Sequence, residues 1–240
     1  MVVNLVEAGL SSHFSPSNVQ ALRQVFETVD AESCPTSFNF HMHTVCSDGR
    51  LQPEGLMEQA IALGLEGLAI TDHHSVQGYQ RAYRWLEEYY WDAQQRHQPS
   101  VLVPRLWTGV EVTARLLDTE VHILGYAFDL TSSAMQPYLQ HHAPHYTDAA
   151  ADRVIASIHA AGGLAVLAHP VRYRRSPEDL IAAAALLGID GVETYYAYDN
   201  PTPWRTSPRQ TERVQRLSST HGLLNTCGTD THGLSLLQRL

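Results

Sequence analysis

The sequence predicts an α/β fold in which about seven short strands alternate with helices. Short apolar runs such as residues 67–71 are typical of strands buried on both faces. Helical patterns follow them, and Pro53 stands where the first turn of one such helix is expected. The length of 240 residues and the hydrophobic fraction of 44% suit one large domain. We therefore expect a closed barrel, with an open doubly wound sheet as the alternative.

The first 37 residues precede this alternation. Residues 15–17 predict the start of a helix, because a proline stands between two serines there. Apolar residues at helical spacing from Val19 to Val29 then predict one amphipathic helix on the outside of the domain. We assign residues 1–37 to an N-terminal helical extension and residues 38–240 to the barrel domain.

The remaining elements follow from the same patterns. Strands are expected at residues 38–43, 67–71, 101–112, 121–128, 163–168, 189–193 and 223–227. Helices are expected after Pro53 and at residues 76–95, 132–142, 147–161, 177–187 and 209–220. Because the link at residues 114–120 is too short for a helical crossover, the third and fourth strands should form a hairpin.

Composition excludes several classes of protein. A net charge of −9 argues against stable binding of bulk nucleic acid through a basic surface. The N-terminus has no basic segment of a signal peptide, and the most apolar run, residues 180–189, is too short to span a membrane. The three widely spaced cysteines predict neither a disulfide framework nor a thiolate zinc site, which suits a reducing cytoplasm. The sequence predicts no oligomeric state.

The end of the first expected strand carries a metal-ligand pattern. His41 and His43 are two residues apart, so in a strand they share a face, and Asp48 follows in a turn. Two imidazoles and a carboxylate are ligands of a borderline divalent metal.

Histidine or acidic residues also stand at or near the end of every other expected strand, where α/β barrels place their chemistry. They are Asp72, His73, His74, Glu111, His122, His169, Glu193, Asp230 and His232. A buried ring of unpaired carboxylates and imidazoles would be costly without cations between them. The pattern as a whole therefore predicts a metal site.

Six motifs, in order H-x-H with S-D-G, T-D-H, G-x-E, H-x-L-G, A-H-P and G-T-D-x-H, resemble those of the polymerase and histidinol phosphatase (PHP) superfamily. The resemblance covers about residues 39–233. It implies a metal-dependent phosphoesterase on a distorted seven-stranded β/α barrel with three divalent ions. With no thiolate ligand, Mn, Zn and Fe all fit such a site. The stretch between His122 and His169 is short, so we expect no cap domain or a minimal one.

The resemblance implies a ligand set for each ion. The first ion would take His41, His43, Glu111 and Asp230. The second would share the bridging Glu111 and add His122 and His169. The third would take Asp48, His73 and His232. Asp72 would hold a ligand histidine in orientation from outside the metal shell.

Four further features are candidates for substrate contact or support. Arg172 and Tyr173 follow the A-H-P motif, and Arg172 either grips a phosphate or lies on a solvated loop. His74 contacts either substrate or solvent, and Glu193 either orients a ligand or is structural. An aromatic group beside the expected site either stacks on a base or packs; it comprises Tyr195, Tyr196, Tyr198 and Trp204.

We expect hydrolysis of a small phosphomonoester, with a nucleotide favoured, by a metal-bridging hydroxide and no side-chain nucleophile. The enzymatic alternative is a 5′-end exonuclease acting on short RNA or DNA, and the S-D-G form makes histidinol phosphate a weaker substrate candidate. A non-catalytic, metal-stabilised interaction module is the alternative of another class.

Overall fold

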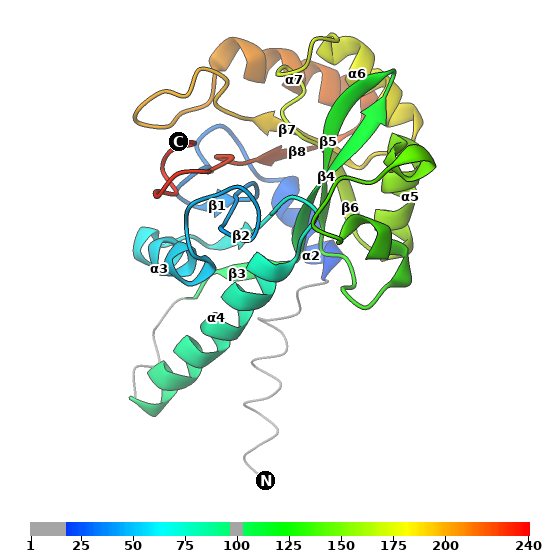
Figure 1. Cartoon of the computed structure of the whole chain (residues 1–240). Coiled ribbons are helices and arrows are strands. Elements are labelled where there is room, and N and C mark those ends of the chain that lie inside the picture. The colour runs from blue at the N-terminus through cyan, green and yellow to red at the C-terminus, as the bar shows by residue number, and fades with distance from the viewer. Residues whose placement is uncertain (1–17, 97–102) are drawn as a thin grey trace.

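The computed structural model describes residues 18–96 and 103–240, and their backbone is organised around two sheets (Figure 1). The first sheet has three parallel strands: β1 (Phe38–Asn39), β2 (Gly67–Ala69) and β3 (Arg105–Trp107). The second sheet has five strands in chain order: β4 (Gly109–Leu116), β5 (Thr119–Tyr126), β6 (Leu164–Leu167), β7 (Gly191–Tyr195) and β8 (Leu224–Cys227). The predicted α/β class is therefore confirmed.

Helices surround the two sheets, with α6 and α7 side by side on one flank and α4 projecting from the other end (Figure 1). The helices of the described chain are α2 (Val19–Phe26), α3 (Pro53–Leu63), α4 (Gln77–Gln95), α5 (Ala151–Ala160), α6 (Pro177–Leu186) and α7 (Pro208–His221). Local sequence sets several of their ends. A proline opens α3, α6 and α7, while Gly64 and Gly222 end α3 and α7 in the left-handed conformation.

The expected hairpin is confirmed, with a tighter turn than the sequence suggested. β4 pairs with β5 in antiparallel register over their whole length, from Gly109 opposite Tyr126 to Leu116 opposite Thr119. The turn is Leu117 and Asp118 alone, both at positive φ, which is the backbone twist that two-residue hairpins favour. β5 also pairs antiparallel with β6, whereas β6, β7 and β8 are parallel.

The distorted seven-stranded barrel expected from the resemblance does not appear as one continuous ladder in the described residues. They form two sheets, of three and five strands. Regular strand pairing is interrupted at Thr108, between β3 and β4, and stops after Asn39 in β1. Isolated contacts connect the sheets where the ladders stop. His73 bridges Glu111, Met42 bridges Thr231, and the amide of Asp230 donates to the carbonyl of His41 at 2.8 Å.

The helix that precedes β1, α2, packs into the core. Leu22 and Phe26 of α2 are buried, and the ring of Phe26 meets that of Phe40 edge-on with centroids 4.9 Å apart. On the outer side, Arg23 pairs with Asp190 at 2.8 Å. The predicted serine and proline start at residues 15–17 lies outside the described residues, and Asn18 caps α2 by accepting from the amide of Ala21.

Three other expected elements are shorter than predicted. The segment at residues 132–142 holds only a 3₁₀ turn, η1 (Ser133–Tyr138), since Pro137 cannot continue an α-helix. The next predicted helix begins at Ala151, after a second 3₁₀ turn, η2 (Tyr146–Ala149). The strand predicted from residue 101 begins at Arg105, and residues 101 and 102 lie outside the described part.

Within the described ranges, every helix is too short or too polar to cross a membrane.

Candidate metal centre

The first two predicted ligands, His41 and His43, lie in the extended segment that follows β1, beside the C-terminal ends of β2 and β8. His41 and His43 point to one side and are fully buried, while Met42 between them packs into the apolar core on the other side. The amide of His43 donates to the carbonyl of Thr231 at 3.0 Å, which fixes this strand against the G-T-D-x-H turn. A side chain at Gly228 would collide with His41, so only glycine permits this close approach.

Glu111 is the centre of the cluster. It alternates on β4 with Val110 and Val112, whose side chains enter the hydrophobic core, so its own side chain faces the opposite way. Its Oε2 lies 3.0 Å from Nε2 of both His41 and His43. On the other oxygen, Oε1 lies 2.7 Å from Nδ1 of His122 and 3.3 Å from Nε2 of His169. Nε2 of His73 lies 3.6 Å from Oε2 of Glu111.

Asp230 closes the buried side of the cluster. Its Oδ1 lies 3.5 Å from Nε2 of His41, 3.3 Å from Nε2 of His43 and 3.4 Å from Nδ1 of His232. The residue has φ +54, a left-handed conformation that non-glycine residues seldom adopt and that often marks functional sites.

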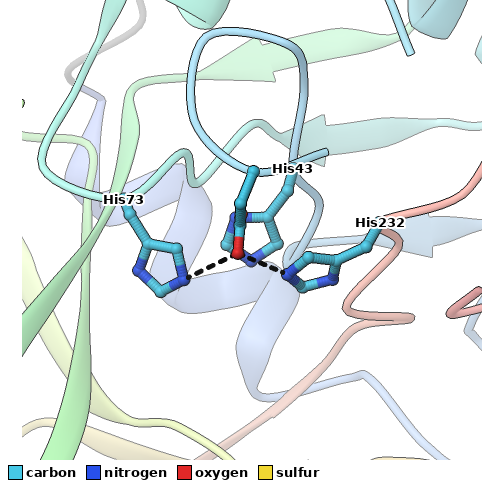
Figure 2. Close-up of side chains that lie close together, drawn as sticks. His43, His73 and His232 are labelled. Atoms are coloured by element: carbon cyan, nitrogen blue, oxygen red, sulfur yellow. Dashed lines mark ion pairs between the residues drawn. The ribbon is translucent and has the colours of Figure 1, made fainter. Parts of the chain in front are cut away.

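Asp48 closes the open side, and its side chain is 55% exposed. Figure 2 shows the imidazoles of His43, His73 and His232 turned toward one point. Asp48 lies among them, with oxygens 3.2 Å from Nε2 of His232, 3.5 Å from Nδ1 of His43 and 3.8 Å from Nε2 of His73.

All nine predicted ligands thus lie in one cluster. Four overlapping groups have ligand atoms within 4.8 Å of one another: His41, His43, Glu111 and Asp230; His43, Asp48, His73 and His232; His73, Glu111 and His122; and His41, His169 and Glu193. The first group equals the set predicted for one ion. The second group adds His43 to the set predicted for the third ion. His122 and His169 both lie near Oε1 of Glu111, in line with the set predicted for the second ion.

Opposing charges set the protonation of the cluster. Burial alone would lower the pKa values of His41 and His43, but the surrounding carboxylates outweigh it. They raise the pKa of His41 well above its ordinary value and that of His43 to about 9. Burial would likewise raise the pKa values of Glu111 and Asp230, yet the imidazoles hold both well below the ordinary range. The metal-free cluster therefore retains protons on His41 and His43, at positions that a cation would take.

The donor set fits divalent metal ions. Both ring nitrogens of the buried His43, and Nδ1 of His122, lack a hydrogen bond of acceptable geometry. Carboxylate oxygens nevertheless lie close to these nitrogens. Imidazole and carboxylate ligands without thiolate suit Mn, Zn or Fe. Burial lowers the pKa of His73 to about 4, so this ring is neutral and able to coordinate at neutral pH.

The two predicted supporting residues have different contacts. Glu193 accepts from Nδ1 of His41 at 2.9 Å and from the amide of His169 at 2.8 Å, so it orients two candidate ligands. Asp72 contacts no ligand histidine directly; it accepts from the amide and hydroxyl of Thr44 and from the hydroxyl of Ser47, each at 2.7 Å. Asp72 therefore holds the loop that carries Asp48, because Thr44 and Ser47 belong to that loop.

The predicted substrate residues also differ from one another. Arg172 is 39% exposed and donates to Oδ2 of Asp230 at 2.9 Å. The hydroxyl of Tyr173 accepts from the amide of His122 at 2.8 Å, a contact that supports the strand. His74 is buried rather than solvated, with Nε2 3.1 Å from the hydroxyl of Thr113.

Sequence reasoning missed the residues behind Asp230. Its Oδ2 accepts from Nε of Arg239 at 2.8 Å and from the hydroxyl of Tyr196 at 2.6 Å, in addition to Arg172. Tyr196 was predicted only as a member of the aromatic group. A lone arginine such as Arg239 gives no signal in the sequence. The C-terminal segment turns back on itself because the amide of His232 donates a hydrogen bond to the carbonyl of Arg239, and this turn is visible only in the structure.

An α/β fold that gathers imidazoles and carboxylates at its strand ends is typical of a metal-dependent hydrolase. Residues 39–184 match the family model of the PHP domain, and the chain belongs to this family.

Relatives with known names support the same class. The chain is 31% identical over 102 residues to the 5′-3′ exoribonuclease Rnm of Salmonella typhimurium, a match that covers 42% of this chain and 31% of the relative. The match thus spans about a third of that protein. A crystal structure from Bifidobacterium adolescentis, described as a metal-dependent phosphoesterase, has TM-score 0.64 and 25% identity and covers 83% of this chain and 88% of its own. An amidohydrolase structure from Chromobacterium violaceum, with TM-score 0.62, 22% identity and coverage of 82% and 88%, shares the fold.

Adding Mn²⁺ to the metal-free protein at pH 7 should release protons, because the raised pKa of His43, about 9, keeps that ring protonated until a metal displaces the proton. The apparent affinity should therefore rise with pH and level off above about pH 9. Calorimetric titration in two buffers of different ionisation enthalpy measures the released protons. Binding at pH 7 without proton release would contradict this assignment.

Removing the guanidinium in Arg239→Ala should weaken Mn²⁺ binding by about tenfold, because outer contacts orient ligand carboxylates. Arg239→Lys should recover part of the loss, as measured by the same titration. Arg213→Ala, which breaks a surface pair with Glu178, is the matched control and should leave affinity unchanged. Equal affinity of Arg239→Ala and the wild type would show that Tyr196 and Arg172 alone hold Asp230.

Proposed function

We propose that the chain is a metal-dependent phosphoesterase that hydrolyses a small phosphomonoester, a nucleotide being the favoured substrate. The observation that carries this proposal is the nine-residue imidazole and carboxylate cluster, buried around Glu111 and open to solvent at Asp48. A cavity of about 290 Å³ opens on that side and is lined in part by Asp48, His73 and His74. A phosphate ester can therefore approach the ligands from outside.

The proposed ligand sets are those implied by the family. His41, His43, Glu111 and Asp230 would hold one ion, Glu111 with His122 and His169 a second, and Asp48, His73 and His232 a third. Bound divalent ions supply positive charge that neutralises a phosphate and lowers the pKa of water. Six neutral imidazoles and three carboxylates leave a formal surplus of about three positive charges when three such ions bind.

Side chains of the chain would orient the ester. Arg172 is the exposed donor to Asp230, and Arg239 and Tyr196 also hold that carboxylate. Arg172 can therefore turn to a phosphate oxygen without leaving Asp230 unpaired, and a guanidinium binds phosphate in bidentate fashion. Glu193 would keep His41 and the backbone at His169 in place while Arg172 turns from Asp230 to the phosphate.

We propose that the two sheets form one distorted barrel of seven strands, with β3 and β4 as a single broken strand. The connection between β5 and β6 holds only η1, η2 and α5, which supports a minimal cap.

Residues 38–240 are proposed as the barrel domain and residues 1–37 as its extension. Cys34, Cys46 and Cys227 are free thiols, which supports the proposed cytoplasmic location.

A 5′-end exonuclease acting on short RNA is the second candidate. The exoribonuclease of Salmonella typhimurium, 31% identical over the matched segment, favours it. The same metal cluster and open side would serve both reactions, since each breaks a phosphate ester.

With Mn²⁺ added, the protein should release inorganic phosphate from AMP or from a 3′,5′-bisphosphonucleoside faster than from histidinol phosphate. Asp230→Asn should abolish the release, because the variant loses a carboxylate charge facing three imidazoles. Malachite-green assays measure phosphate, and mass spectrometry of a 5′-phosphorylated RNA oligonucleotide detects nucleotides removed from its end. Bound metal with neither product would contradict the phosphoesterase proposal.

A further inference from the structure

A second cavity lies farther along the hairpin that carries Glu111. It has a volume of about 490 Å³, within the range of small-molecule pockets. Its wall on the hairpin includes Thr113, Arg115 and Glu120, and its opposite wall includes His145 and Tyr146 from the connection between β5 and β6. None of these residues belongs to the metal cluster.

The hairpin sets the distance between the two sites. Glu111, Thr113 and Arg115 alternate on β4, so their side chains share a face. Because a strand rises about 3.3 Å per residue, Thr113 lies about 7 Å and Arg115 about 13 Å from Glu111 along the strand. His122 is the register partner of Thr113, and Glu120 is the partner of Arg115. The cavity therefore begins at the strand position directly opposite the candidate ligand His122.

His74 connects the two sites structurally. Its Nε2 lies 3.1 Å from the hydroxyl of Thr113 in the cavity wall, and it directly follows the candidate ligand His73. The carbonyl of His74 accepts from the amide of His141 at 2.9 Å, which fixes the start of the segment that forms the opposite wall. The cavity is thus held in a defined position relative to the metal cluster.

An aromatic ring stands at the edge of this cavity. Tyr146 is 97% exposed, the highest value among the exposed large apolar or aromatic side chains of the described chain. Its φ of +52 is a strained conformation that sets the direction of the side chain. The ring of His145 lies 6.3 Å from that of Tyr146 and stacks on His142 at 5.7 Å. Exposed flat rings of this kind are platforms on which nucleic-acid bases stack.

The polar groups of the cavity can form hydrogen bonds with a base. Glu120 is exposed in the wall, and its carboxylate would repel a phosphate but can accept a hydrogen bond from an exocyclic amino group. Arg115, also exposed, can donate to a ring nitrogen or a carbonyl oxygen. Alanines at positions 143, 149 and 150 leave room for a flat ring.

We propose that this cavity binds a nucleobase of the substrate, with Tyr146 as its stacking platform, while the phosphate ester lies at the metal cluster. The proposal rests on the proposed phosphoesterase function and names its substrate class as nucleotides. The span of about 7 to 13 Å along β4 matches the separation of a base from its own or a neighbouring phosphate.

The test compares two phosphomonoesters that share ribose 5-phosphate and differ in the base: AMP and ribose 5-phosphate. Tyr146→Ala should raise KM for AMP by about tenfold and leave kcat within twofold, because stacking on the platform is lost. KM for ribose 5-phosphate should not change, and Tyr146→Phe should restore the AMP value. Trp91→Ala removes an exposed aromatic side chain on α4 that does not line the cavity, and it should behave as the wild type.

A second variant blocks the cavity directly. Ala149→Trp places a large side chain in the half-buried wall and should raise KM for AMP while sparing ribose 5-phosphate. Unchanged KM for both AMP and the 5′-phosphorylated dinucleotide pApA in both variants would overturn the proposal, and so would equal losses for AMP and ribose 5-phosphate. The 5′-phosphorylated dinucleotide pApA distinguishes the source of the base. An effect of Tyr146→Ala on pApA alone would assign the cavity to the neighbouring nucleotide of an RNA end.

Failure of catalysis is distinguishable from failure of the base site. If no substrate releases phosphate, calorimetric titration of the full-length protein with adenosine still measures base binding. Adenosine binding that Tyr146→Ala loses and Tyr146→Phe keeps would support the base site even though the proposed hydrolysis had failed. Absence of adenosine binding to an inactive wild-type protein would contradict both the proposed hydrolysis and the proposed base site.

Discussion

Both oxygens of the buried Glu111 carboxylate lie against imidazole rings, with His41 and His43 at one oxygen and His122 and His169 at the other. Such a group is too costly to bury without cations, either protons or metal ions. The carboxylates raise the pKa values of His41 and His43, so the metal-free protein keeps protons there. The same residues can exchange these protons for divalent ions, which would give the cluster the positive charge that the proposed phosphate substrate requires.

The backbone adapts to this cluster. Regular pairing stops after Asn39 in the first sheet and between β3 and β4, and isolated contacts such as His73 with Glu111 replace it where the candidate ligands lie. His169 and Asp230 have φ values of +27 and +54, which regular strands do not permit. Irregular backbone near the cluster lets side chains from distant segments converge, and the hydrophobic core behind Val110 and Val112 holds the hairpin in place.

The sequence predicts the cluster well because its signals are local. Two histidines at a spacing of two and a glutamate inside an apolar run can be recognised without knowing the fold. The break at Thr108 could not be recognised, because residues on both sides suit a strand. Neither could the contact of Arg239 with Asp230, which depends on how the last residues turn back, nor the exposure of Tyr146, which follows from a positive φ in a short 3₁₀ turn.

Anomalous diffraction at the manganese edge from crystals grown with Mn²⁺ would show whether the Glu111 cluster holds divalent metal ions. We predict peaks within coordination distance of Glu111, one of them between His41, His43 and Asp230, with the direct contacts between imidazole and carboxylate replaced by metal bonds. A map without peaks in the cluster, in which Glu111 still contacts His41 and His122 directly, would contradict this prediction.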